Sequence, residues 1–180
     1  KPYGLADKAT EFNRAAAALA KEAVGANGIV AASVGPTGHI VEDEGGDVSE
    51  EELYESFKEQ IAALAGGGAD AICIETMASL SEAGQAVKAA KDATPLPVIC
   101  TFTFDPGKRG FRTMMGVTPE RAARELVDAG VDVIGTNCGN GIVNMIEITR
   151  QMRTAAPDTP ILVHANAGAP VVEDGKTVFK

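Results

Sequence analysis

A cysteine between glycines, Cys138, has both the side chain and the surroundings that chemistry requires. It lies within residues 135–141, which read Gly-Thr-Asn-Cys-Gly-Asn-Gly, after an apolar run at residues 131–134 and before a helical pattern at residues 142–152. This order predicts a loop at the C-terminal end of a strand, where glycines let the backbone and a ligand approach each other closely. A thiol there can act as a nucleophile or as a metal ligand. The alternatives are an inert loop thiol or an anion cradle at the N-terminus of the next helix.

The other two cysteines, Cys73 and Cys100, lie inside apolar runs that predict buried strands. Cysteine in such a position behaves as a small hydrophobic residue, so we assign neither thiol a chemical role. Three scattered cysteines do not make a disulfide framework. Free thiols are typical of a reducing compartment, and we therefore expect a cytoplasmic protein.

Polar side chains also stand at the ends of the other predicted strands. Glu75 ends an otherwise apolar strand, and because a buried, unpaired carboxylate is costly, we expect it to pair with a cation. That cation is either the ammonium group of a substrate or a Lys or Arg side chain at the rim. Asn166 has donors and acceptors that suit a substrate carboxylate or loop closure, and His164 is a metal ligand or a structural residue. The residues expected at the site are Ser33, Glu75, Thr76, Asn137, Cys138 and Asn166.

Helices and strands alternate along the chain and must position these residues. Continuously apolar runs predict strands at residues 29–34, 71–75, 97–102, 131–135 and 161–164. Helical patterns cover residues 7–25, 49–65, 79–92, 118–129 and 142–155. The spacing between strands is that of strand–helix repeats, and unbroken apolar strands indicate a parallel sheet covered by helices.

Capping residues and apolar faces define the predicted helices further. In the first helix we expect Asp7 as the N-cap and Gly25 as the stop. One face of this helix is apolar and consists of Phe12, Ala15, Ala16, Leu19 and Ala23. Ser49 and Glu52 form a capping-box pattern before the second helix, and Thr118 is the expected N-cap of the fourth.

Two architectures fit this alternation, a doubly wound sheet and a (β/α)8 barrel. No Gly-x-Gly-x-x-Gly motif stands at the first strand–helix turn, which disfavours a dinucleotide-binding sheet. Polar residues follow every strand, and a barrel gathers that end of all its strands around one axis. We therefore expect an α/β fold, an incomplete (β/α)8 TIM barrel of about five parallel strands with helices outside. A complete barrel needs about 250 residues, so residues 1–180 are expected to form a single domain that lacks the first strands and the last strand.

Composition restricts the partners that this chain can have. Its formal net charge is −9, and no basic stripe offsets it, so we expect neither nucleic acid nor an anionic membrane as a partner. No apolar run is long enough to span a membrane. Residues 1–4 lead directly into the first helical pattern, so no signal peptide is expected.

Four short motifs follow the predicted strands in order. They are Val-Gly-Pro-Thr-Gly at residues 34–38, Ile-Glu-Thr at 74–76, Gly-Thr-Asn-Cys at 135–138 and His-Ala-Asn-Ala-Gly-Ala-Pro at 164–170. In this order they resemble motifs of the homocysteine S-methyltransferase family, which includes the homocysteine-binding module of cobalamin-dependent methionine synthase. The resemblance covers nearly the whole chain. It implies a (β/α)8 barrel in which a zinc ion holds homocysteine as a thiolate that attacks a methyl group.

The resemblance also implies roles for single residues. Cys138 matches the first of three zinc-binding cysteines, Glu75 the acidic residue that meets the substrate amino group, and Asn166 an asparagine near the bound amino acid. The family's other two zinc ligands stand in a Gly-Gly-Cys-Cys motif that this sequence does not contain. The opening strands of the family barrel are also missing. The resemblance therefore implies a middle piece of such a barrel, with two zinc ligands that are not in this chain.

The resemblance thus implies a methyltransferase domain that activates homocysteine through zinc and forms methionine. The expected methyl donor is a corrinoid-bound methyl group derived from methyltetrahydrofolate, which would reach the site through a cobalamin-binding partner module, or a donor of the betaine or S-methylmethionine type. Two rivals stay open: a corrinoid-linked methyltransferase with another small methylated substrate, and a non-catalytic barrel fragment that acts as a binding or assembly module. Exposed apolar edges of an incomplete barrel predict self-association.

Overall fold

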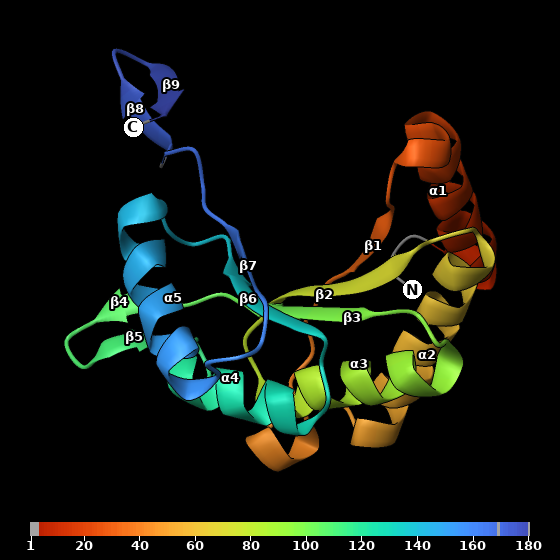
Figure 1. Cartoon of the computed structure of the whole chain (residues 1–180), viewed down its shortest axis with the longest axis horizontal. Coiled ribbons are helices and arrows are strands. Elements are labelled where there is room, and N and C mark those ends of the chain that lie inside the picture. The colour runs from red at the N-terminus through yellow and green to blue at the C-terminus, as the bar shows by residue number, and fades with distance from the viewer. Residues whose placement is uncertain (1–3, 169, 180) are drawn as a thin grey trace. The chain divides into compact units, whose positions relative to one another are not determined.

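The computed structural model describes residues 4–168 and 170–179, along which helices and strands alternate (Figure 1). The strands of the main sheet are β1 (Ala31–Val34), β2 (Ala71–Met77), β3 (Val98–Phe102), β6 (Val133–Asn137) and β7 (Ile161–His164). The helices are α1 (Ala9–Val24), α2 (Glu50–Gly66), α3 (Leu80–Ala93), α4 (Pro119–Asp128) and α5 (Ile142–Ala155), with short 3-10 turns η1 (Ala6–Lys8), η2 (Gly25–Asn27) and η3 (Glu42–Glu44). Two hairpins join β4 (Asp105–Gly107) to β5 (Gly110–Arg112) and β8 (Pro170–Glu173) to β9 (Lys176–Phe179).

Neighbouring strands of the main sheet follow the chain in the order β1-β2-β3-β6-β7 over the described residues. β1 pairs with β2 in parallel, and β6 pairs with β7 in parallel. A sequential order of this kind belongs to a (β/α)8 barrel, whereas a doubly wound sheet reverses its order at a switch point. The predicted α/β class, with parallel strands and intervening helices, is confirmed, and the strand order agrees with part of a barrel.

Two compact units make up the described chain. The first covers residues 4–74 and 81–99, and the second covers residues 75–80 and 100–179 except residue 169. β2 and β3 each begin in the first unit and end in the second. The residues at the C-terminal ends of β2, β3, β6 and β7 therefore all belong to the second unit.

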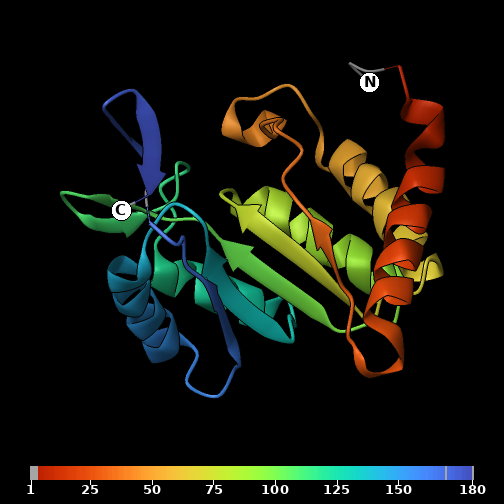
Figure 2. The same cartoon turned by 90° about the horizontal axis from the view of Figure 1, so that it is seen from above.

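In the first unit, α1 packs along α2 (Figure 2). The capping box predicted for α2 is confirmed, because Ser49 Oγ accepts from the Glu52 N–H at 3.3 Å and Glu52 Oε2 accepts from the Ser49 N–H at 3.0 Å. These two bonds satisfy backbone donors that the first turn leaves without an intrahelical partner. The apolar residues at helical spacing in α2 are buried: Leu53, Phe57, Ile61 and Leu64.

The apolar face predicted for α1 does not face the core. Phe12 is 46% exposed and Leu19 is 66% exposed, and Ala15, Ala16 and Ala23 are exposed as well. The opposite side of α1 meets α2 instead, with Ala17 buried and Gln60 Nε2 donating to Asn13 Oδ1 at 3.2 Å. A small residue and a polar pair bring the two helices together, so the larger apolar side chains point outward.

The start of α1 also differs from the prediction, and its end agrees. Asp7 lies inside η1, and Lys8 occupies the N-cap position of α1. The expected cap is wrong because the chain already turns at Ala6 and takes Asp7 into that turn. Gly25 follows the last helical residue with a φ of 64°, which confirms the predicted stop.

Asp70 links the C-terminal part of α1 to the start of β2. Lys21 Nζ lies 2.7 Å from Asp70 Oδ2, and the Val30 N–H donates to the same oxygen at 2.8 Å. The ammonium group of Lys21, and then the N–H of Val30, hold the pKa of Asp70 below its usual range.

In the second unit, α4 and α5 pack against β6, and α5 also contacts β7. The predicted cap of α4 is confirmed, since Thr118 Oγ1 accepts from the Arg121 N–H at 3.3 Å and Pro119 begins the helix. A Cβ atom on Gly135 would lie 2.2 Å from the carbonyl oxygen of Leu162, so glycine is required where β6 passes β7. Ile134, Met145, Ile148 and Met152 are buried between these elements.

No helix within residues 4–168 and 170–179 combines the length and the apolar character needed to cross a membrane.

Candidate functional site

Asn137, the last residue of β6, is the hydrogen-bonding centre of the strand ends in the second unit. It is 3% exposed, and its Oδ1 accepts from the Thr76 N–H at 3.0 Å and from Thr101 Oγ1 at 2.7 Å. Its Nδ2 donates to Thr76 Oγ1 at 2.8 Å and to Cys138 Sγ at 3.3 Å. One amide thus joins the ends of β2, β3 and β6 and contacts the thiol. The sequence places Thr101 among the polar residues at the ends of the predicted strands, but Thr101 is not one of the six residues expected at the site.

Thr76 and Cys138 share an unusual backbone conformation. Their φ angles are 67° and 56°, in the left-handed region. This conformation costs an L-residue roughly 1–2 kcal/mol, and it is rarest for β-branched residues such as threonine. Asn137 hydrogen-bonds to both residues, which helps to hold them there. Strain of this kind is found most often at functional sites.

Gly139 lets the Cys138 loop pass close to the chain that follows β3. Its φ is 69°, and a Cβ atom on it would lie 3.0 Å from Thr103 Cγ2 and 3.4 Å from the carbonyl oxygen of Phe104. Both the conformation and the space therefore favour glycine. The sequence predicts a close approach between this loop and a ligand. In the structure, Gly139 closely approaches Thr103 and Phe104 of the same chain.

Backbone hydrogen bonds join the loop after β6 to the loop after β7. The Cys138 N–H donates to the His164 carbonyl at 3.2 Å, and the Asn166 N–H donates to the Asn140 carbonyl at 2.9 Å. Asn140 is 4% exposed, and its Nδ2 donates to the Phe104 carbonyl. From the sequence, the only role considered for Asn140 is in an anion cradle. In the structure, Asn140 hydrogen-bonds to the loop after β7 and to the segment after β3.

Of the other predicted site residues, two belong to the second unit and one belongs to the first. Glu75 is half-buried and directly precedes Thr76 in β2. Asn166 is exposed and is fixed to the Cys138 loop through its backbone. Ser33 belongs to the first unit, where it is exposed on β1 in register with Cys73.

The thiols have the accessibility that the sequence predicts. Cys138 is exposed, whereas Cys73 and Cys100 are 6% and 0% exposed. Within residues 4–168 and 170–179, no group of three or more His, Cys, Asp or Glu side chains is arranged to hold a metal ion. The described residues therefore supply one exposed thiol and not a complete zinc ligand set, because a structural or catalytic zinc site needs at least three protein ligands.

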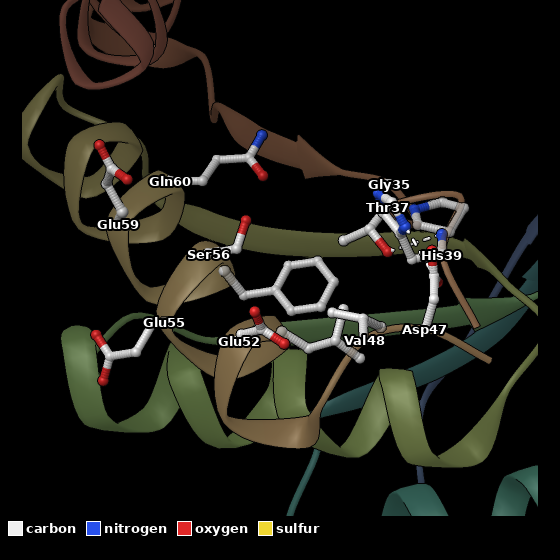
Figure 3. Close-up of a pocket in the computed structure, with 13 residues that line it drawn as sticks. Gly35, Thr37, His39, Asp47, Val48, Glu52, Glu55, Ser56, Glu59 and Gln60 are labelled. Atoms are coloured by element: carbon white, nitrogen blue, oxygen red, sulfur yellow. Dashed lines mark hydrogen bonds and ion pairs between the residues drawn. The ribbon is translucent and has the colours of Figure 1, made fainter. Parts of the chain in front are cut away.

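A cavity of about 1050 Å³ lies in the first unit, along α2 and the loop that follows β1 (Figure 3). Its lining includes the carboxylate side chains Asp47, Glu52, Glu55 and Glu59, together with Thr37, His39, Ser56 and Gln60. None of the six residues predicted for the site lines this cavity.

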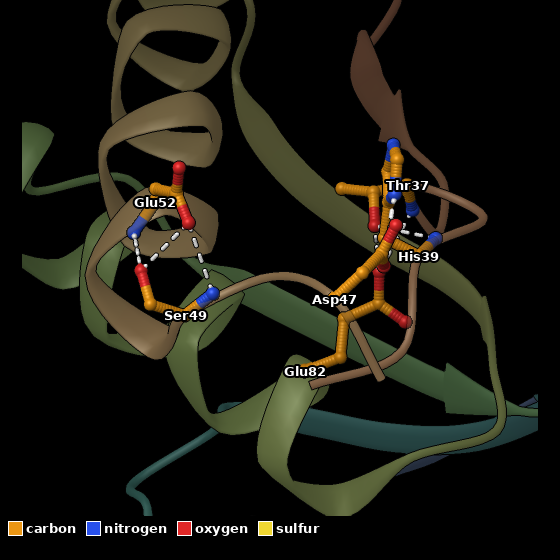
Figure 4. A network of polar contacts seen from close by, with 6 residues as sticks. All are labelled: Thr37, His39, Asp47, Ser49, Glu52 and Glu82. Carbon is orange, nitrogen blue, oxygen red and sulfur yellow. Dashed lines mark hydrogen bonds and ion pairs between the residues drawn. The ribbon is translucent and has the colours of Figure 1, made fainter. Parts of the chain in front are cut away.

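A polar network holds the loop beside this cavity (Figure 4). Glu82 is 5% exposed, and its Oε1 accepts from the N–H and from the Oγ1 of Thr37, both at 2.7 Å. His39 Nδ1 lies 3.4 Å from Asp47 Oδ1 at an exposed position. The Gly-Pro-Thr-Gly loop is therefore bonded to α3 through a buried carboxylate.

A second cavity, of about 620 Å³, borders Asn166 in the second unit. Among the described residues, Ala167, Gly168, Pro170 and Phe179 also line it. The space beside the Asn166 amide is therefore mainly apolar and large enough for a small molecule.

A sequence model of the family described as homocysteine S-methyltransferase matches residues 1–179. Betaine–homocysteine S-methyltransferase 1 of Danio rerio is 30% identical over 155 residues, which are 86% of this chain and 36% of the fish protein. Methionine synthase of Mycobacterium tuberculosis is 30% identical over 125 residues, which are 67% of this chain and 10% of that protein.

Among solved structures, the chain is similar to the homocysteine methyltransferase MmuM from Escherichia coli in its apo form. The TM-score is 0.65 at 22% sequence identity, and the match covers 78% of this chain and 50% of that one. At this identity the likeness concerns the fold alone. The chain spans about a third of the fish protein's length, about a tenth of the mycobacterial one and half of the E. coli one.

Proposed function

The chain belongs to the homocysteine S-methyltransferase family, and from this membership we propose that it is the homocysteine-binding part of a methyltransferase that forms methionine. The observation that carries the proposal is the exposed thiol of Cys138, held at the end of β6 by an amide that also binds Thr76. Family membership supports the reaction, and the network supports the position of the substrate.

Each predicted residue has a role that suits its chemistry. The Glu75 carboxylate pairs with the substrate ammonium group, and the Asn166 amide donates to the substrate carboxylate. The Thr76 hydroxyl, whose oxygen accepts from Asn137, keeps a hydrogen that can be donated to the amino acid. Ser33, which belongs to the first unit, stays a prediction from the sequence. In this proposal, residues 1–180 form a single domain with the fold of part of a (β/α)8 barrel.

The substrate sulfur must lose its proton before it can take a methyl group. A free thiol has a pKa near 8.5, so most of it is protonated at neutral pH, whereas the thiolate is the nucleophile. Zinc, when bound, deprotonates a coordinated thiol. Cys138 is proposed as one zinc ligand, and the ligands that complete the set are not among the described residues. In the overall reaction, homocysteine releases its S–H proton to the solvent and its sulfur forms a bond to the methyl carbon. The bond between the methyl group and the donor breaks, and its electron pair stays with the donor.

The proposal leaves two classes of donor, and they differ in what they need. A corrinoid donor, recharged from methyltetrahydrofolate, requires a cobalamin-binding partner module. A betaine or S-methylmethionine donor requires only space beside the homocysteine sulfur. The described cysteines form no disulfide, which supports the cytoplasm as the compartment.

Homocysteine binding tests the proposal directly. Replacing Glu75 with Gln removes the negative charge, and we expect the affinity for homocysteine to fall by about ten- to a hundredfold, because a hydrogen bond to a charged group contributes about 1.5–3 kcal/mol. Isothermal titration of the chain with homocysteine measures the change. Glu125→Gln is the matched control, because Glu125 is an exposed carboxylate in α4. Equal affinity of the Glu75→Gln variant and the original chain would refute the role of Glu75.

The two alternative functions predict different results for homocysteine binding and methyl transfer. A corrinoid-linked enzyme for another substrate would bind a different methyl acceptor and leave homocysteine unbound. A non-catalytic module would transfer no methyl group from methylcobalamin, betaine or S-methylmethionine to homocysteine, even when the rest of the barrel is present. Methionine formation that Cys138→Ala abolishes and Cys73→Ala preserves would exclude both rivals.

A further inference from the structure

Asn137 uses every hydrogen-bonding position of its side-chain amide within the protein. An asparagine amide has two donor hydrogens and an oxygen with two acceptor positions. The Oδ1 of Asn137 accepts two hydrogen bonds and its Nδ2 donates two, all within the protein. A substrate contact would have to displace one of these bonds.

The two donated bonds define a geometry. Both hydrogens of one planar group are directed at Thr76 Oγ1 and at Cys138 Sγ, at 2.8 and 3.3 Å. The plane of the amide therefore fixes where the thiol lies relative to the hydroxyl. The two accepted bonds, from the Thr76 N–H and from Thr101 Oγ1, fix the amide itself in a buried position.

We infer that Asn137 is a positioning residue, whose amide holds the Cys138 sulfur beside Thr76. When an amino-acid thiol binds at Thr76, its sulfur then lies next to the Cys138 sulfur. This inference rests on the proposed function and assigns Asn137 a different role from the substrate contact expected from the sequence. The N–H···S bond orients the Cys138 sulfur, and the hydrogen bonds between Asn137 and Thr76 fix that orientation relative to the substrate position. A variant that loses only the hydrogen-bond donor to Cys138 should therefore no longer hold the Cys138 sulfur next to the substrate position at Thr76.

Thiol–disulfide exchange measures this alignment without a metal and without methyl transfer. The Cys138 thiolate attacks one sulfur of homocystine, the S–S bond breaks, a mixed disulfide forms, and one homocysteine leaves as a thiolate. Bis(2-hydroxyethyl) disulfide undergoes the same exchange but lacks the amino-acid group. The ratio of the two rates at one pH is independent of the thiolate fraction of Cys138. Mass spectrometry of the peptide that contains Cys138 separates this exchange from any at the buried Cys73 and Cys100.

We expect the unchanged chain to react with homocystine about tenfold faster than with the hydroxyethyl reagent, since correct placement of reacting groups is worth factors of this size or more. Asn137→Ala should bring the ratio close to one. Asn137→Asp keeps an acceptor for the Thr76 N–H and for Thr101, and lets the Thr76 hydroxyl donate to it, but has no donor for Cys138 Sγ. It should lose the preference as Asn137→Ala does while it retains the fold.

Thr103→Val is the matched control. Thr103 Oγ1 donates to the backbone carbonyl of Asn137 at 2.8 Å and leaves the amide untouched, so this variant should keep the full ratio. Circular dichroism and the thermal unfolding midpoint verify that each variant is folded.

The possible outcomes separate the two proposals. No preference for homocystine in the unchanged chain would overturn the proposed amino-acid site, and the inference with it. A preference that survives in both Asn137 variants would overturn only the role of Asn137. A preference lost in Asn137→Ala but kept in Asn137→Asp would mean that the amide merely joins β2 to β6, and it too would overturn the inference.

Discussion

Cys138 depends for its orientation on a neighbouring amide as well as on its own loop. The thiol is exposed, but the residue has a left-handed backbone, and its sulfur accepts a hydrogen bond from a side chain that is 3% exposed. The thiol is thus accessible at the surface while it accepts a hydrogen bond from a buried side chain. Such support for a reacting group is typical of sites that require accurate geometry.

Substitutions at Cys138 should reveal the cost of its backbone conformation. Glycine adopts a φ near 56° without the penalty of roughly 1–2 kcal/mol that an L-residue bears. We therefore expect Cys138→Gly to leave the free energy of unfolding unchanged or to raise it by about 0.5–1 kcal/mol, while it removes the thiol. Cys138→Val should lower it, because β-branched residues rarely adopt this conformation. Urea unfolding of both variants measures the difference, and a glycine variant less stable than the valine variant would contradict this explanation.

The sequence could identify Cys138 but not what surrounds it. The apolar run before it and the glycines around it are local signals, and they correctly distinguish it from the buried Cys73 and Cys100. The partners of Asn137 lie on β2 and β3, far away in sequence. Their meeting depends on the register between parallel strands, which apolar strands without alternation do not reveal.

At the scale of elements, polar contacts determine how α1 lies against α2. The side of α1 that faces α2 carries Asn13, Ala17 and Lys21, and Lys21 continues to Asp70 at the start of β2. Asp70 also accepts the N–H of Val30, just before β1. One carboxylate therefore connects a helix to the beginnings of two strands.

The Asp70 contacts predict a pH-dependent contribution to stability. Because the folded state lowers the pKa of Asp70, the ionised carboxylate stabilises the fold, and this contribution is fully present above the pKa of the unfolded chain. It falls as the pH drops below about 4, where the unfolded chain takes up the proton first. Asp70→Asn should therefore lower the thermal midpoint at pH 7 and have less effect at pH 3. An effect of the substitution that grows on acidification would contradict the assignment.

The sequence correctly predicts the caps of α2 and α4 but not that of α1, and it does not show that the apolar stripe of α1 points away from α2. The caps at Ser49 and Thr118 involve residues three positions apart, so the local sequence contains the whole interaction. The outward face of α1 could not be predicted in this way. Its apolar stripe has the spacing of a core face, but the choice of face depends on the side chains that α2 offers, Gln60 among them.

At the scale of the whole molecule, the exposed stripe on α1 and the net charge of −9 act in opposite directions. Phe12 and Leu19 leave apolar surface in water, which favours association. Like charges on two copies repel each other, and salt screens that repulsion. The fold class itself followed from the alternation of helices and apolar strands, and the sequential strand order agrees with it.

Self-association of the chain should therefore depend on the α1 stripe and increase with salt. We expect the weight-average mass in sedimentation equilibrium to rise with protein concentration, and Phe12→Gln with Leu19→Gln to reduce that rise. Val143→Gln is the control, because Val143 is 79% exposed on α5 and outside the stripe. A monomer at all concentrations, or equal effects of the stripe and control variants, would refute a second copy as the partner of this face.

The Asn137 amide at the end of β6 limits how the Cys138 loop can be transferred to another protein. Thr76 and Thr101 reach Asn137 from two other strands, so the cysteine loop is not a self-contained cassette. Grafted alone onto a new scaffold, the loop would carry the Cys138 sulfur without Thr76 and Thr101, which hydrogen-bond to the Asn137 amide. A recipient protein must also offer hydroxyl-bearing residues at the same depth on two adjacent strands.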